Sequence, residues 1–141
     1  MPNHFHFFIH ANHKTVMNDR KGRNVLSEGF KNLLSSYAKA INVQKKRTGS
    51  LFTQNTHGKN VTGKIKHAFS CFHYIHQNPL RAGLVDRIED WHYSSFRNYC
   101  GLRNGTMCNK NLARKLFDFN DENFYSLSYG VIQNDFLKNI F

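Results

Sequence analysis

The chain opens with histidines that alternate with large apolar side chains, in the order His-Phe-His-Phe-Phe-Ile-His from position 4. Alternation with a period of two is typical of a β-strand that turns one face toward a core. The pattern predicts that Phe5, Phe7 and Ile9 point into that core. His4 and His6 then lie side by side on the opposite surface, where two imidazoles can bind one cation.

A second constraint is a helical pattern from about Val61 to Asn78, which we expect Pro79 to stop because the residue before a proline disfavours the helical conformation. At 100° per residue, one apolar arc contains Ile65, Ala68, Phe69, Phe72 and Ile75. Tyr74 points away from that arc, and Asn78 lies one turn later on the same face. The phenol of Tyr74 and the amide oxygen of Asn78 are therefore predicted to lie close together. His76 falls on the core side, where a structural role is expected.

Charge is distributed unevenly along the chain. The net charge is +11, yet no Asp or Glu occurs between Gly29 and Val85. A solvated surface of scattered lysines normally includes carboxylates, so this stretch favours a polyanion such as nucleic acid as its partner. Taken alone, the loop from Lys45 to Arg47 fits a merely soluble surface equally well. The candidate nucleic-acid-binding residues are Lys45, Lys46, Arg47, Lys59, Lys64, Lys66 and Arg81.

Cysteine content and hydropathy indicate a compartment. Cys71, Cys100 and Cys108 are too few and too irregularly spaced for a disulfide framework or a zinc ribbon, which favours a reduced cytosolic protein. No apolar run approaches the roughly 20 residues of a membrane span, and the start lacks a basic leader followed by an apolar stretch. We therefore expect a cytoplasmic protein with no membrane partner.

Two other stretches have helical signals. A helix capped by Ser27 is predicted to pack one face onto the sheet, with apolar residues Phe30, Leu33, Leu34, Tyr37, Ala38 and Ile41. The last thirty residues, which carry most of the remaining acidic side chains among aromatic ones, are predicted to form one or two short helices. The aromatic-rich segment 90–96 is expected to close the core.

Two longer motifs resemble those of a known protein family. Residues 1–7 read Met-Pro-Asn-His-Phe-His-Phe, and residues 74–85 read Tyr-Ile-His-Gln-Asn-Pro-Leu-Arg-Ala-Gly-Leu-Val. Further matching positions are Gly49, Ser50, Leu51, Phe52, Trp91, Tyr93, Ser94 and Ser95. Over most of residues 1–100 the chain resembles the REP-associated tyrosine transposases. These are relatives of the insertion-sequence transposases that carry a His-hydrophobic-His motif and one catalytic tyrosine.

The resemblance implies an α+β fold in which helices back an antiparallel, ferredoxin-like (RRM-like) sheet. Residues 1–100 would form the catalytic domain, and residues 101–141 a C-terminal helical tail. Members of the family carry a strand, a helix and a further strand before the Met-Pro-Asn turn, so the domain is expected to be partial at its N-terminus. A homodimer in the prokaryotic nucleoid is also implied.

The resemblance further implies a reaction. His4, His6 and Asn78 would hold a divalent metal, Mg²⁺ or Mn²⁺, and Tyr74 would attack single-stranded, hairpin-forming DNA. A free phenol attacks poorly at neutral pH, so a cation nearby would help to form the phenolate. The product would be a 5′-phosphotyrosine linkage that keeps the bond energy for rejoining, without ATP.

Two alternatives stay open. One is a non-catalytic remnant that binds single-stranded DNA or RNA through the basic stretch. The other is a small histidine-rich metal-binding protein, which would explain the histidines but would give no role to Tyr74, Asn78 or the charge.

Overall fold

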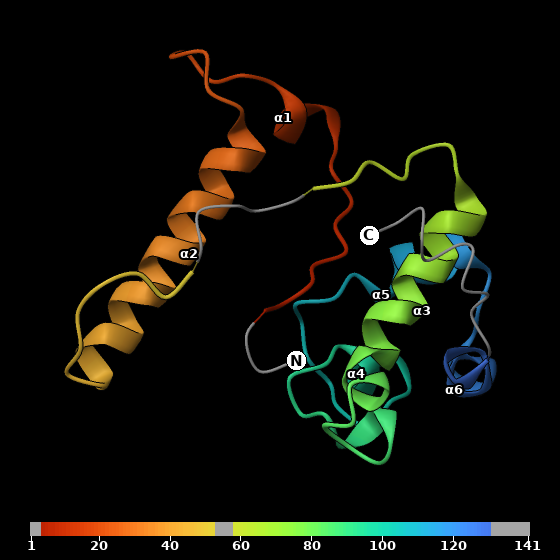
Figure 1. The fold of residues 1–141 in the computed structure, drawn as a ribbon. Helices are drawn as coiled ribbons and strands as arrows, with labels where there is room; N and C mark the ends of the chain where they lie inside the picture. Colours follow the sequence, from red (N-terminus) through yellow and green to blue (C-terminus); the bar gives the residue numbers. More distant parts are fainter. Residues whose placement is uncertain (1–3, 53–57, 131–141) are drawn as a thin grey trace. The chain divides into compact units, whose positions relative to one another are not determined.

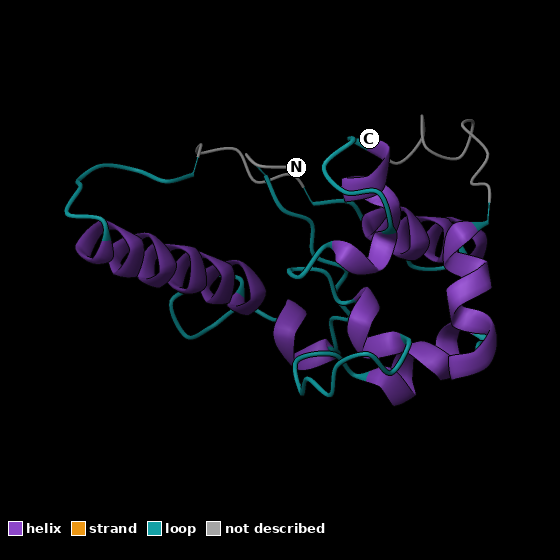
Figure 2. Ribbon diagram, turned by 90° about the horizontal axis from the view of Figure 1, so that it is seen from below, coloured by secondary structure: helices purple, strands orange, loops and turns teal. Residues whose placement is uncertain are grey.

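The computed structural model describes residues 4–52 and 58–130, which consist almost entirely of helices and loops (Figure 1 and Figure 2). The helices in chain order are α1 (His13–Val16), α2 (Val25–Gln44), α3 (Ile65–Arg81), the 3₁₀ helix η1 (Ile88–Asp90), α4 (Phe96–Tyr99), α5 (Lys110–Phe117) and α6 (Asp121–Tyr129). Within those residues, strand pairing is limited to one isolated antiparallel bridge between Asn18 and Asn24. The predicted antiparallel, ferredoxin-like sheet is therefore wrong.

The chain divides into two compact units. One unit joins Met1–Phe8 to Lys59–Phe141, and the other is Ile9–Gly58. All buried apolar residues of the described chain lie in the first unit, together with α3 to α6. The second unit contains α1 and α2.

The histidine-rich opening is not a strand, and its predicted inward face is exposed. Phe5, Phe7 and Ile9 are 44%, 51% and 46% exposed. Phe8 makes the core contact instead, with its ring centroid 5.9 Å from that of Phe72. Phe7 and Phe8 are adjacent aromatic residues that interrupt the alternation. Phe8 is an even number of positions from the histidines, and it is the one that packs in the core.

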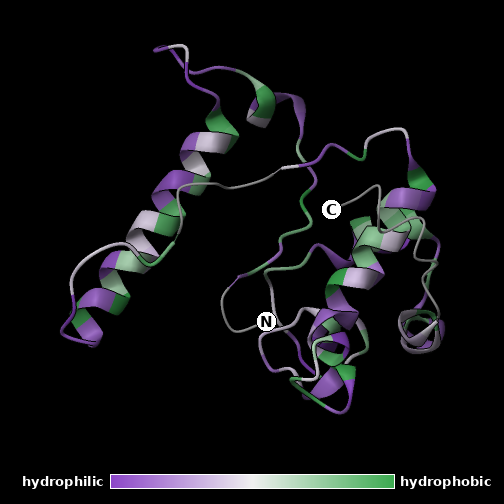
Figure 3. Ribbon diagram, in the orientation of Figure 1, coloured by the Kyte–Doolittle hydropathy of each residue, from purple (hydrophilic) through white to green (hydrophobic). Residues whose placement is uncertain are grey.

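Helix α2 begins earlier than predicted because Asn24, and not Ser27, is its N-cap. The Asn24 Oδ1 atom accepts a hydrogen bond from the backbone N–H of Ser27 at 3.0 Å. The helix keeps the predicted amphipathic pattern, which Figure 3 shows as alternating apolar and polar colours. None of its residues is buried, however, so the expectation of a core helix packed on a sheet is wrong.

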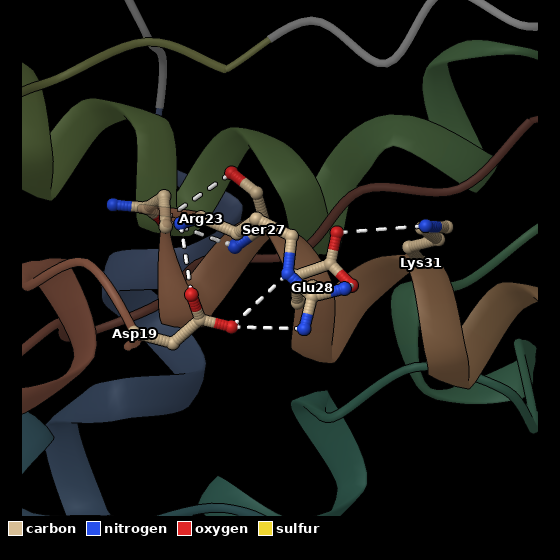
Figure 4. A network of polar contacts seen from close by, with 6 residues as sticks. Asp19, Arg23, Ser27, Glu28 and Lys31 are labelled. Carbon is tan, nitrogen blue, oxygen red and sulfur yellow. Dashed lines mark hydrogen bonds and ion pairs between the residues drawn. The ribbon is translucent and has the colours of Figure 1, made fainter. Parts of the chain in front are cut away.

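The polar loop before α2 is held by an ion-pair network (Figure 4). Arg23 joins Asp19 at 2.9 Å and Glu28 at 3.1 Å, and Lys31 joins Glu28 at 3.5 Å. Asp19 also accepts the backbone N–H of Lys21 and of Arg23, and these contacts lower the pKa of the carboxyl below its ordinary value. The network connects the loop to the first turns of α2.

The core of the first unit is aromatic and is centred on α3. Phe72 stacks on Phe117 with ring centroids 4.9 Å apart, and Phe119 meets Phe124 at 4.8 Å. Phe96, from the segment expected to close the core, is completely buried. Where one or two short C-terminal helices are predicted, the described residues contain α5 and α6, and these supply much of this core.

Helix α3 runs through Pro79 to Arg81, so the predicted stop before the proline is wrong. Proline lacks the N–H that would bond the preceding turn, but the following turn is intact. The backbone N–H of Ala82 donates to Asn78 O at 3.0 Å, and that of Leu84 donates to Pro79 O at 3.0 Å. Gly83 then ends the helix with a φ of +66°, a conformation that favours glycine.

Two buried histidines fix α3 to its surroundings. His73 Nδ1 shares a hydrogen bond of 2.9 Å with Ser128 Oγ of α6, and His76 Nε2 shares one of 2.8 Å with Ser95 Oγ. Both rings are only 1% exposed and lie among aromatic side chains. Burial lowers the pKa of His73 to about 4 and, with the charge of His73, that of His76 to about 3. The structural role predicted for His76 is confirmed.

Glu89 joins η1 to α6 through a buried carboxylate. It accepts hydrogen bonds from the hydroxyl groups of Tyr125 at 2.7 Å and Tyr129 at 2.6 Å, and it pairs with Arg87. Burial alone would raise its pKa, but the two hydroxyl donors and the Arg87 charge outweigh that effect and lower the pKa to about 2. The carboxylate therefore stays ionised while it holds the helix.

The histidine pair predicts a stability that falls on mild acidification. As the pH drops below 6.5, His73 and His76 take up protons in the unfolded chain but stay neutral in the folded protein. The reason is that their pKa values in the folded protein are about 4 and about 3. For each pH unit of acidification, protonation of each histidine in the unfolded chain should lower the free energy of unfolding by about 1.4 kcal/mol. Urea denaturation between pH 6.5 and 5, above the main carboxylate range, measures this slope.

A matched pair of variants isolates the effect. His76→Gln places an amide nitrogen near the position of Nε2 and removes the ionisable ring, so the slope between pH 6.5 and 5 should fall by about half. His13→Gln, on the exposed helix α1, should leave the slope unchanged. Equal slopes in the wild type and in His76→Gln would contradict the argument.

Candidate metal and nucleophile site

The predicted nucleophile, Tyr74, lies on α3 on the face turned away from the aromatic core. It is half-buried. The guanidinium carbon of Arg81 lies over its ring, 5.7 Å from the ring centroid. Seven residues separate the two, which amounts to two helical turns less about 20°, so they share a face by helix geometry. A phenol and a cation are therefore presented together.

The two histidines at the start of the chain lie next to each other, as predicted. The ring centroids of His4 and His6 are 5.1 Å apart, with the rings almost perpendicular. Burial, followed by the charge of His4, lowers the pKa of His6 below 6.5. A neutral imidazole is the form that binds metals, and two imidazoles with metal bonds of about 2 Å suit this separation.

Asn78 is buried, with 5% of its surface exposed. Its backbone carbonyl accepts the helical hydrogen bond from Ala82, whereas its side-chain Nδ2 has no hydrogen-bond partner in the described part of the chain. An amide with an unmatched buried atom is costly unless something else pairs with it. Asn78 therefore fits a ligand-binding role, in which Oδ1 would bind a metal and Nδ2 a neighbouring oxygen.

Phe8 connects the histidine segment to α3. Phe8 contacts Phe72, and two residues along a helix correspond to a rotation of about 200°. This contact therefore lies on the face of α3 that is nearly opposite Tyr74. The convergence of His4 and His6 with Tyr74 and Asn78 stays a prediction. Within residues 4–52 and 58–130, no three side chains of His, Cys, Asp and Glu gather as a metal-binding group.

The buried histidine that the sequence reasoning missed is His73. From the sequence, His73 is one of several histidines that could lie near the site without being assigned a role there. Its partner Ser128 is 55 positions away, so periodicity within α3 could not reveal the bond. His73 therefore serves the packing of α6.

The seven candidate nucleic-acid-binding residues are all exposed and are divided between the two units. Lys45, Lys46 and Arg47 follow α2, where the chain turns back through Lys46 with a φ of +50°. Asn42 Nδ2 donates to Gly49 O at 2.8 Å and holds this basic turn. The remaining four, Lys59, Lys64, Lys66 and Arg81, lie within or just before α3.

Comparisons of the chain with family models, with curated proteins and with solved structures find no match. Among the described residues, no helix combines the length and apolarity needed to cross a bilayer.

Metal binding by the candidate ligands can be measured directly. Titration of Mn²⁺, followed by its electron paramagnetic resonance signal, should give one site per chain. His4→Ala, His6→Ala and Asn78→Ala should each weaken that site at least about tenfold, because each removes one ligand. His13→Ala should bind as the wild type does. Weakening by the two histidine variants but not by Asn78→Ala would exclude the three-residue site.

Proposed function

We propose that this protein is a metal-dependent, single-tyrosine transposase that cleaves and rejoins single-stranded, hairpin-forming DNA. The observation that carries the proposal is the pairing of Tyr74 with the Arg81 guanidinium on the face of α3 that the core leaves open. Support also comes from the adjacent imidazoles of His4 and His6 and from the buried, incompletely bonded amide of Asn78. Hairpin DNA is the proposed partner, and a dimer is the proposed assembly.

The proposed reaction exchanges one phosphodiester for another. The Tyr74 oxygen attacks the phosphorus, the bond from phosphorus to the deoxyribose O3′ breaks, and the phenolic proton leaves to solvent while the 3′-oxygen gains one. The 5′-phosphate remains on Tyr74 until a 3′-hydroxyl reverses the step. A divalent metal bound by His4, His6 and Asn78 would polarise a non-bridging phosphate oxygen and offset the charge that develops there.

The charge of the chain supports a nucleic-acid substrate. The unit Ile9–Gly58 contains nine basic and two acidic residues, and the candidate basic residues are exposed. Contacts from such residues to phosphates give affinity without sequence specificity. Selection of a target would then depend on the folded shape of the DNA and on stacking of unpaired bases.

The same basic stretch supports a second candidate function, binding of single-stranded DNA or RNA without chemistry. This function uses Lys45, Lys46, Arg47 and the lysines near α3, and it gives Tyr74 no special role.

One experiment separates the two candidates. The full chain is incubated with Mn²⁺ and a hairpin oligonucleotide labelled at its 3′ end, because the transposase would retain the 5′-phosphate of the 3′ fragment. A labelled, denaturation-resistant adduct is expected, and Tyr74→Phe should abolish it by removing the attacking oxygen. Tyr93→Phe, which changes a side chain that is 88% exposed, is the matched control and should keep the adduct.

A salt-sensitive mobility shift without an adduct would favour the binding function. An adduct that persists in Tyr74→Phe would assign the chemistry to another residue.

A further inference from the structure

The guanidinium above Tyr74 has a position that charge alone does not explain. Arg81 is the last residue of α3, and its side chain is exposed. A cation at this end of a helix interacts favourably with the helix dipole wherever its side chain points. The cation–π contact with the Tyr74 ring, at 5.7 Å from the ring centroid, selects one direction for the side chain and brings the cation beside the phenol.

Two arginines of this unit have carboxylate partners, and Arg97 and Arg103 donate to backbone carbonyls, whereas Arg81 does neither within the described residues. Arg87 pairs with Glu89, and Arg114 pairs with Asp121. The stretch from Gly29 to Val85 offers no acidic residue to Arg81. The contact with the ring leaves the N–H groups of the Arg81 guanidinium without an acceptor among the described residues, so they can donate to an anion. Phosphate matches these donors because two of its oxygens can accept parallel hydrogen bonds.

We propose that Arg81 binds the non-bridging oxygens of the phosphodiester that Tyr74 attacks, an inference that rests on the proposed function. The ring of Tyr74 orients the guanidinium, and the guanidinium holds the phosphate beside the hydroxyl group of the same ring. Arg81 forms no covalent bond and transfers no proton. Its donors stabilise the negative charge that grows on the phosphate oxygens as the new bond forms.

This role differs from that of a residue that only adds affinity for DNA. A donor directed to charge that develops in the transition state accelerates the chemical step more than it strengthens binding. Arg81→Ala should therefore slow adduct formation at saturating DNA about 100-fold while it weakens DNA binding by less than about threefold. Arg81→Lys should recover part of the rate, because a lysine supplies charge without the planar fork.

Lys115→Ala is the matched control. It removes one positive charge from an exposed residue of α5 in the same unit, and it should leave the rate of adduct formation unchanged. Circular dichroism of each variant reports whether the helices are kept. Equal rates in Arg81→Ala and Lys115→Ala would overturn the proposal.

A binding measurement tests Arg81 even if no adduct forms. The side-chain Nε–H resonance of Arg81, assigned with isotope-labelled arginine and the Arg81→Lys variant, should shift when thymidine dinucleotide is added. The uncharged methylphosphonate analogue should not shift it. A response to the dinucleotide in a protein without strand-transfer activity would retain the phosphate site and reject the transposase function, whereas no response would reject the Arg81 site. Stronger saturation by inorganic phosphate than by the dinucleotide would also overturn the assignment to a phosphodiester.

Discussion

The attachment of α3 to α6 is the interaction on which the rest of the first unit depends. Phe72 packs against Phe117 and Phe124, and the bond between His73 and Ser128 fixes the two helices in register. Gln77 extends the attachment by one turn, because its Nε2 donates to the carbonyls of Ser128 and Gly130. Polar bonds inside an aromatic core are costly to break, since each partner would be left buried and unsatisfied.

This attachment also determines which part of α3 can act on another molecule. One side of α3 packs in the core, and Tyr74 and Arg81 lie on the other side. A reactive group on a helix anchored in this way is positioned more precisely than one on a loop. The basic turn after α2 belongs to the other unit, so it can contribute affinity for a long polyanion independently of the geometry at Tyr74.

The sequence predicted local periodicity well and long-range pairing poorly. The apolar arc of α3 correctly placed Ala68 and Phe72 in the core, and the angle count correctly placed His76 there. The predicted sheet failed because alternation describes a strand only where another strand pairs with it, and strand pairing in the described residues is limited to the bridge between Asn18 and Asn24. Of the candidate site, the adjacency of His4 and His6 was predictable, whereas the contact of Arg81 with Tyr74 depends on a side-chain conformation that helical spacing alone does not determine.

Two neighbouring amides on α3 differ in how their burial is compensated. Gln77 and Asn78 are similarly buried, at 6% and 5% exposed. The Gln77 nitrogen makes two hydrogen bonds to α6 and the residue after it, while the Asn78 nitrogen has no partner in the described residues. An asparagine kept only for packing would be replaced at little cost by an apolar residue of similar size, since it carries the desolvation penalty without the bond. In the proposed site, its position one turn after Tyr74 would let that amide bind the same ligand as the phenol and the guanidinium.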